Sequence, residues 1–344
     1  MPRAVTGGPA SVPLVRRAAA SPGGWIQELL FSPCGSFVVA STADGPVHVL
    51  HSAGLLPRFV LDGHFPGTTS VSLRHDGACL VTGGQDGTVA LWDVTTGALV
   101  RRVPSGGWVT RVAWKPGEDL FAVAAGRALQ LRDADGAVVR SFEEHPSTVS
   151  DLAFGPGGRE IATAAYNGVL RFSAVRERPV QRLEWKGSSL ALAWSPNGKY
   201  IATGDQDATV HFFHVGSGKN SMMSGYPFKV LELSWEARSR YLATGGGPEV
   251  IVWDCTGRGP EGSTPIVLPG HEERVTAVAY QRRGPLLASG GADGVVALWD
   301  PSRGERVLAV ATVGDPVTAL AWSPDDSFLA AGTESGEVVV LERP

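Results

Sequence analysis

Two pairs of histidines have the spacing His-x-x-His, which could supply ligands to a transition metal. His48 and His51 stand in "HVLH", and His211 and His214 stand in "HFFH". A zinc site requires ligand nitrogens that converge within about 2.1 Å of one ion. Both segments have the composition of β-strands, on which positions i and i+3 point to opposite faces. We therefore predict ordinary strand histidines and no metal site.

Two glycine-rich stretches resemble nucleotide-binding loops. "GRGPEG" at residues 257–262 matches G-x-G-x-x-G, but a dinucleotide site also needs a helix that begins at those glycines. The following "STPIVLPGH" reads instead as a strand that runs into a Gly-His pair. "VGSGKN" at 215–220 lacks the first glycine of a phosphate loop and has Asn220 in place of Ser or Thr. Neither G-x-S-x-G nor H-E-x-x-H occurs, so we predict no catalytic residue, no cofactor and no enzymatic activity.

The elements that carry these residues repeat along the chain. One phrase recurs eight times: a short apolar alternation, a large side chain, and then a proline or polar turn, as in "VTRVAWKPG" and "LALAWSPNG". Successive large residues are separated by 40 to 45 positions. They are Phe31, Leu73, Trp114, Phe154, Trp194, Trp235, Tyr280 and Trp322. An internal period of this length is typical of a repeat architecture.

Each repeat contains three further strand-like phrases. The second has the form "YIATGD", the third has the form "DGTVALWD", and a weaker fourth has the form "ALVRRVP". Asp86-Gly87, Asn167-Gly168 and Asp293-Gly294 are suited to two-residue hairpin turns, which need positive φ. Period-two alternation without helical periodicity indicates an all-β protein. We predict a closed β-propeller of eight four-stranded blades, with seven blades as the alternative.

At this point the chain resembles the WD-repeat family. The residues that carry the resemblance are the dipeptides Trp92-Asp93, Trp253-Asp254, Trp299-Asp300, Gly63-His64 and Gly270-His271. The resemblance covers roughly residues 13 to 343. It implies a propeller fold and a role as a rigid platform for a protein or peptide partner. Because one fold hosts many functions, the functional part of this reading comes from the family and not from the fold.

The resemblance also implies a structural polar network in two repeats. It is expected to join His64, Thr82, Asp86 and Trp92 in one repeat, and His271, Ser289, Asp293 and Trp299 in another. Such networks satisfy buried polar groups. A His–Asp–Ser set could alternatively form a catalytic triad. The recurrence of the set in two repeats favours the structural role.

The first residues of the chain repeat a stretch from its middle. "PLVRRAA" near the N-terminus aligns with fourth strands such as "ALVRRVP", whereas the last repeat ends at "VVVLERP" without a fourth strand. We expect the N-terminal strand to complete the last blade, because an open ring would leave unpaired strand edges. The predicted domains are a tail over residues 1–12 and a single propeller over residues 13–344.

Composition excludes several other classes. The 344 residues are 43% hydrophobic and 19% charged, with a net charge of −4, which is not the basic balance of a nucleic-acid binder. The three cysteines are far apart and form no CxxC motif, so neither a disulfide framework nor a zinc knuckle is indicated. The sequence contains no apolar run long enough for a signal peptide or a membrane helix. We expect a cytoplasmic protein that is monomeric on its own and binds neither nucleic acid nor membrane.

Loops that lead into the first strand of each repeat are the candidate binding surface. They should lie on one face of the ring, around the mouth of its channel, and Trp, Tyr and Arg dominate binding hot spots. The candidate residues are Trp25, Phe65, Trp108, Tyr226, Phe228, Lys229 and Arg274. Alternatively, each aromatic side chain could fill its own blade.

Two other functions stay open from the sequence. An enzyme that acts near the axis would need clustered groups on the first strands. The charged residues there, Glu28, Arg111, Asp151 and Glu232, belong to different repeats and form no recognised set. The chain could also be a sensory or assembly subunit of a larger complex.

Overall fold

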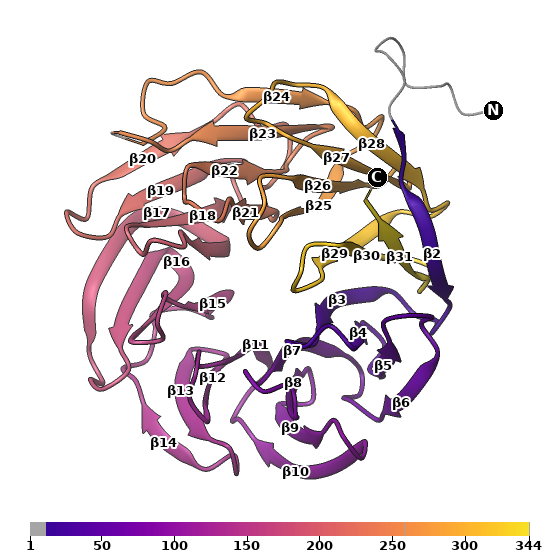
Figure 1. Cartoon of the computed structure of the whole chain (residues 1–344). Helices are drawn as coiled ribbons and strands as arrows, with labels where there is room; N and C mark the ends of the chain where they lie inside the picture. Colours follow the sequence, from indigo (N-terminus) through magenta and orange to yellow (C-terminus); the bar gives the residue numbers. More distant parts are fainter. Residues whose placement is uncertain (1–11, 258, 344) are drawn as a thin grey trace.

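The computed structural model describes residues 12–257 and 259–343, and these form a ring of β-sheets (Figure 1). Among these residues there is no helix. The innermost strands, such as β3, β7 and β11, surround the centre of the ring, and strands such as β6 and β10 form its rim. The predicted all-β propeller is therefore observed. The expected tail falls mostly on residues 1–11, outside the described residues, but its last residue, Val12, belongs to a strand.

The first three sheets have four antiparallel strands each, in chain order from the centre outward. The first contains β3 (Ile26–Phe31), β4 (Phe37–Thr42), β5 (Val47–His51) and β6 (Pro57–Leu61). The second contains β7 (Thr68–Leu73), β8 (Cys79–Gly84), β9 (Thr88–Asp93) and β10 (Ala98–Pro104). The third contains β11 (Val109–Trp114), β12 (Leu120–Ala125), β13 (Ala128–Asp133) and β14 (Val138–Ser141).

Three sheets form the last part of the ring. One contains β21 (Leu233–Trp235), β22 (Tyr241–Thr244), β23 (Glu249–Asp254) and β24 (Ile266–Pro269). The next contains β25 (Val275–Tyr280), β26 (Leu287–Gly291), β27 (Val295–Trp299), β28 (Val307–Thr312) and the short β1 (Val12–Pro13). The last contains β29 (Val317–Trp322), β30 (Phe328–Thr333), β31 (Val338–Glu342) and β2 (Val15–Ala20).

Between these groups lies one six-stranded sheet that spans the fourth and fifth repeats. Its strands are β15 (Asp151–Phe154), β16 (Glu160–Ser173), β17 (Pro179–Trp194), β18 (Tyr200–Asp205), β19 (Val210–His214) and β20 (Asn220–Met223). β16 and β17 are long: the first half of β17 pairs with β16 and its second half pairs with β18. The hydrogen-bonded sheets therefore number seven, which is the alternative to the eight blades expected from the repeats.

The strand β2 lies on the outer edge of the last sheet. β2 pairs antiparallel with β31, from Val15 opposite Glu342 to Ala20 opposite Val338. Immediately before it, β1 pairs parallel with β28, and Leu14 between the two strands is buried. The N-terminal segment thus contacts two neighbouring sheets.

The hydrophobic core lies between the faces of neighbouring sheets. The second strand of each sheet is almost wholly buried, because both of its faces are covered. One core cluster joins Val38 of the first sheet to Val338 of the last, and a hydrogen bond of 2.6 Å joins Thr318 Oγ1 to the carbonyl of Ile26. Equivalent hydroxyl-to-carbonyl bonds link the inner strands of other neighbours, for example Thr69 to Val109 at 2.6 Å.

Candidate functional site

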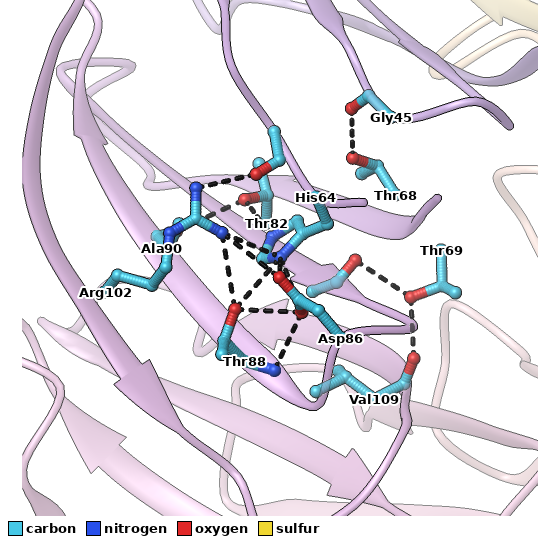
Figure 2. Close-up of polar contacts among 12 residues, drawn as sticks. Gly45, His64, Thr68, Thr69, Thr82, Asp86, Thr88, Ala90, Arg102 and Val109 are labelled. Carbon is cyan, nitrogen blue, oxygen red and sulfur yellow. Dashed lines mark hydrogen bonds and ion pairs between the residues drawn. The ribbon is translucent and has the colours of Figure 1, made fainter. Parts of the chain in front are cut away.

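The first polar network centres on His64, whose side chain is wholly buried (Figure 2). Its Nε2 lies 2.8 Å from Thr82 Oγ1, and Trp92 Nε1 donates to the same hydroxyl oxygen at 3.1 Å. Its Nδ1 lies 3.0 Å from the carboxylate of Asp86. A neutral imidazole satisfies Asp86 and Thr82, because Nδ1–H donates to Asp86 while Nε2 accepts from Thr82. Burial lowers the pKa of His64, in agreement with the neutral form.

The second network has the same form. His271 Nε2 lies 2.8 Å from Ser289 Oγ, and Trp299 Nε1 donates to that oxygen at 2.8 Å. His271 Nδ1 lies 3.1 Å from Asp293 Oδ1. The two sets of four residues are therefore brought together as the family resemblance implies. The side chains of His64 and His271 are wholly buried, so a substrate cannot reach the imidazole.

Removing the shared hydroxyl of a network should destabilise the fold. Ser289→Ala leaves His271 Nε2 and Trp299 Nε1 without partners in a buried site. An unsatisfied buried polar group costs about 1–3 kcal/mol, so we expect a loss of about 2–4 kcal/mol. Urea unfolding of the variant measures this loss. The control Ser217→Ala alters an exposed turn and should change the free energy of unfolding little; equal stability of the two variants would contradict the structural role.

The remaining repeats fill the histidine position in other ways. His145 lies 2.7 Å from the hydroxyl of Thr163, but Phe172 replaces the tryptophan. Tyr226 takes the histidine position of the sixth repeat: its hydroxyl lies 2.9 Å from Thr244 Oγ1 and accepts from Trp253 Nε1 at 2.9 Å. Tyr226 was expected at the binding surface; it is half-buried and completes a polar network instead.

Trp185 takes the histidine position of the fifth repeat. Its ring lies against the ring of the buried His211, with 3.7 Å between the ring centroids and a tilt of 33° between the planes. Within the described residues, both nitrogens of His211 and Nε1 of Trp185 have no hydrogen-bond partner. Burial lowers the pKa of His211 to about 4. This repeat has therefore lost the polar network.

The remaining histidines of the two His-x-x-His pairs include one exposed side chain, His51, and two half-buried ones. In the described part of the chain, no three His, Cys, Asp or Glu side chains are grouped as a metal site would require.

Charged groups on the first strands pair with one another. Arg111 forms ion pairs with Glu28 and with Asp151, the latter at 3.0 Å. Glu28 also accepts the N–H of Val71 at 2.8 Å, and Asp151 accepts the N–H of Leu192 at 2.8 Å. These carboxylates thus join successive inner strands, and their lone pairs are used by the fold. Glu232 lies apart, and burial raises its pKa.

Four of the candidate binding side chains are strongly exposed. The exposed fraction is 50% for Trp25, 85% for Phe65, 56% for Trp108 and 52% for Phe228. The backbone of the tryptophans is fixed, because the carbonyl of Trp25 accepts from Ala43 N–H at 2.9 Å and that of Trp108 from Gly126 N–H at 3.1 Å. Lys229 is also exposed, and Arg274 is half-buried.

Trp25, Phe65 and Trp108 precede the inner strands of three consecutive sheets, so they form one arc of the loop face. We call these three residues the aromatic arc. Phe228 and Lys229 precede β21, the inner strand of the sixth repeat, and Arg274 precedes β25, the inner strand of the seventh, on another part of the ring. The structure therefore divides the predicted binding residues into two groups and moves Tyr226 into the interior.

Comparison with known families identifies the repeat. The family model for the WD domain, G-beta repeat matches residues 56–93, 136–172, 178–214, 262–300 and 308–340, together more than half of the chain. The chain belongs to the WD40 repeat family.

Curated WD40 relatives are distant and longer. The chain is 26% identical over 320 residues to telomerase protein component 1 of Mus musculus, covering 90% of this chain and 12% of that protein. It is 24% identical over 285 residues to actin-interacting protein 1 of Caenorhabditis elegans, covering 79% of this chain and 46% of that protein. The chain thus spans less than half the length of either relative.

A solved structure shares the WD40 fold of this chain. The computationally designed Ika8 protein superposes with a TM-score of 0.81 at 22% identity, covering 95% of this chain and 99% of that chain. At this identity the likeness shows the fold alone. No helix in the described part of the WD40 chain is long and apolar enough to cross a membrane.

Repeat spacing could have identified the network of Tyr226. Tyr226 and Thr244 are 18 residues apart, as are His64 and Thr82, so the tyrosine stands in the WD40 histidine position. The pairing of Arg111 with Glu28 has no comparable sequence signal, because the two residues come from repeats that are not adjacent.

Proposed function

We propose that this WD40 propeller is a non-catalytic scaffold that binds a protein or peptide partner on its loop face. The observation that carries the proposal is the exposure of the aromatic arc. Large aromatic side chains on a fixed backbone bind at low entropic cost, because little conformational freedom remains to be lost. Hot spots of protein interfaces are enriched in Trp and Tyr.

Three features favour the arc over isolated exposed residues. Its side chains come from three consecutive sheets, so a single partner could cover all of them. Trp25 follows Gly23 and Gly24, and Trp108 follows Gly106 and Gly107, which offer no side chain to cover the indole rings. Phe65 follows His64, whose buried network fixes the loop. Phe228, Lys229 and Arg274 would serve as a second contact region.

The alternative, an enzyme active near the axis, has less support. Its charged candidates Glu28, Arg111 and Asp151 bind one another and backbone N–H groups, so they hold inner strands together. As part of the same proposal, we place the chain in the cytoplasm as a monomer that binds neither nucleic acid nor membrane. The printed name of the actin-interacting relative, which describes protein binding by that protein, is in keeping with a scaffold.

The proposal includes a ring of eight blades that is closed by β2. Within the six-stranded sheet, Ser150 Oγ donates to the carbonyl of Ser189 at 2.5 Å, as hydroxyls do between neighbouring sheets elsewhere. Ala162 and Val169 of β16 pack with Ile201 and Phe213 in one core cluster, as the faces of neighbouring sheets do. These contacts support two blades that share continuous strands.

Truncating the tryptophans of the arc should weaken partner binding. For Trp25→Ala and Trp108→Ala we expect a loss of about 2 kcal/mol or more each, typical of hot-spot residues. The measurement is the affinity of each variant for a partner captured with the wild-type chain. The side chains are half-exposed, so both variants should melt like the parent.

Val175→Ala is a matched control, because Val175 is 72% exposed on a turn between β16 and β17, away from the loops that enter inner strands. It should bind with parental affinity. Full affinity of both tryptophan variants, together with a loss on changing the turn at residues 257–262, would assign binding to another surface.

A further inference from the structure

A pocket rich in arginine lies between two neighbouring sheets, at the end of their strands opposite the aromatic arc. It has a volume of about 320 Å³. Its walls are the turns that connect β21 to β22 and β25 to β26, and the turn that follows β27. Arg238, Arg240, Arg283 and Arg303 line it. Because these turns follow the first and third strands, the pocket is separate from the loops that enter the first strands.

The four arginines differ in what holds them. Arg240 contacts Asp254 at 3.1 Å and lies over the ring of Tyr241, with 4.7 Å to the centroid. Arg303 contacts Asp300 at 3.2 Å. Neither Arg238 nor Arg283 forms an ion pair through its side chain with any carboxylate in the described ranges 12–257 and 259–343. Two guanidinium groups from different turns are therefore available to a ligand.

The carboxylates near the pocket are directed at backbone groups. Glu236 is buried and accepts the N–H groups of Arg238 at 2.9 Å and Arg240 at 3.2 Å. Asp326, also buried, accepts the N–H groups of Arg282 at 2.8 Å and Arg283 at 2.9 Å. These hydrogen bonds fix the arginine-bearing turns. A third carboxylate, Asp300, lines the pocket; it pairs with Arg303 and accepts from Ser302 Oγ at 2.5 Å. None of these carboxylates forms an ion pair with the side chain of Arg238 or Arg283 in the described part of the chain.

Behind the pocket residue Tyr241, Tyr280 packs in the same core cluster. Tyr280 is 94% buried, since its exposed fraction is 6%, and within the described residues its hydroxyl has no hydrogen-bond partner. Trp322 occupies the equivalent position of the next repeat, and its Nε1 donates to the carbonyl of Ala279 at 2.9 Å. The tyrosine hydroxyl reaches farther than the indole nitrogen and has no such acceptor.

Tyr280 is not one of the residues that line the pocket, and its hydroxyl is buried. Burial is the main cause that raises the pKa of Tyr280, so the phenol keeps its proton. The arginines are therefore the groups that the pocket offers to a ligand.

We propose that this pocket binds a phosphate group, free or carried as a monoester on a small molecule. Arg238 and Arg283 would hold its oxygens through charge-assisted hydrogen bonds. Two free guanidinium groups match the dianion charge of a phosphate, whereas a carboxylate with one charge and two oxygens is satisfied by one arginine. The pocket also has room for the group that carries the phosphate.

Titration calorimetry with sodium phosphate at constant ionic strength tests the proposal. We expect the wild-type chain to bind with a dissociation constant on the order of 1 mM or lower. Arg238→Gln and Arg283→Gln should each weaken binding about tenfold or more, since each removes a charge-assisted contact. Arg282→Gln is the matched control, because Arg282 is exposed beside Arg283 but does not line the pocket. It should bind like the wild type.

Tyr280→Phe is a second control, because Tyr280 does not line the pocket. The hydroxyl has no partner among the described residues, so its removal should leave the melting temperature equal or higher and phosphate binding unchanged. Glycerol 3-phosphate, with glycerol as the uncharged control, distinguishes a monoester from the free ion. The proposal is overturned if neither phosphate nor glycerol 3-phosphate binds, or if Arg282→Gln weakens binding as much as Arg283→Gln.

Discussion

Deletion of residues 1–20 is expected to lower the melting temperature by at least several degrees. The deletion removes β1 and β2, and with β2 it removes the outer partner of β31 over its whole length. It also removes Leu14, which packs with Ala309, Val339 and Leu341 and whose N–H donates to Val310 at 2.9 Å. Each lost backbone hydrogen bond contributes about 1 kcal/mol and the buried leucine about 2 kcal/mol. The total loss is on the order of 5 kcal/mol.

The ion pairs that the same segment forms contribute less. Arg16 pairs with Glu337 and Arg17 with Glu342, but both arginines are about half exposed. Exposed pairs of this kind contribute about 0–1 kcal/mol. The pairing of β2 therefore accounts for most of the effect, and it also covers an edge that would otherwise invite association with other chains.

Two controls isolate the closing strand. Deletion of residues 1–11 leaves β1 and β2 in place, and comparison of the two deletions assigns the difference to residues 12–20. If the longer deletion does not fold alone, a synthetic peptide of residues 12–21 added to it should restore a cooperative melting transition. Equal melting temperatures of the two deletions would show that β2 does not hold the ring together.

The second large effect concerns Asp205, which is expected to destabilise the protein at neutral pH. Asp205 is fully buried, and its Oδ1 has no partner among the described residues. Its other oxygen has only distant donors, Thr203 at 3.4 Å and Thr209 at 3.5 Å. Burial raises the pKa of this carboxyl to about 6, above its ordinary value of 3.8.

The direction of the pH dependence follows from this raised pKa. Between about pH 4 and pH 6 the folded chain keeps a proton on Asp205 that the unfolded chain releases. The free energy of unfolding therefore falls as pH rises through this window and then stays level with respect to this group. A shift of about two units corresponds to about 3 kcal/mol. His211 has the opposite pH dependence, because burial lowers its pKa to about 4. Between about pH 6.5 and pH 4 the unfolded chain binds a proton that the folded chain does not, so the free energy of unfolding falls as pH falls through this window.

Asp205→Asn should therefore raise stability at pH 7.5 by up to about 3 kcal/mol. It should also remove the part of the pH dependence between pH 4 and 6 that comes from Asp205. The measurement is the urea midpoint as a function of pH. Asp135→Asn, which changes an exposed carboxylate in the turn between β13 and β14, is the control and should keep the parental pH profile. A loss of stability in Asp205→Asn at pH 7.5 would mean that the carboxylate is satisfied in the fold.

The position of Asp205 also explains why this buried carboxylate is tolerated. The equivalent residue is Gly84 in the second repeat, where an added Cβ would lie 2.2 Å from the Cβ of His64. The fifth repeat has Trp185 in place of the histidine, so the space beside the second strand is occupied differently. The fifth repeat thus differs from the second at two neighbouring positions, with Trp185 in place of the histidine and Asp205 in place of the glycine.

Sequence periodicity predicted the features that depend on local pattern. Strand alternation and the 40 to 45 residue period predicted the propeller, and the likeness of residues 13–19 to fourth strands placed β2 beside β31. The sequence did not predict the long strands β16 and β17. Tyr166 lies opposite Ser188, and this extra pairing joins segments that read as separate strands in the sequence. Sheet continuity of this kind depends on how two turns lie in space.

Exposure of the aromatic residues was harder to predict than their positions. Tyr226 stands nine residues before the large residue of its repeat, Trp235, in the histidine position, where its hydroxyl bonds Thr244 and Trp253. Trp25 and Trp108 stand six residues before the large residues of their repeats and are exposed. The ion pair between Arg111 and Glu28 depends on side-chain length and on the curvature of the ring, and the repeat period encodes neither.

The central claim, that a partner binds the aromatic arc of a WD40 scaffold, is tested most directly by hydrogen exchange of the chain with and without its captured partner. We expect slower exchange in the complex at residues 23–26, 64–68 and 106–109, which carry Trp25, Phe65 and Trp108. The outer strands β10 and β14 should exchange at the same rate in both states. Protection confined to outer strands or to the turn at residues 257–262, with none at the arc, would contradict the claim.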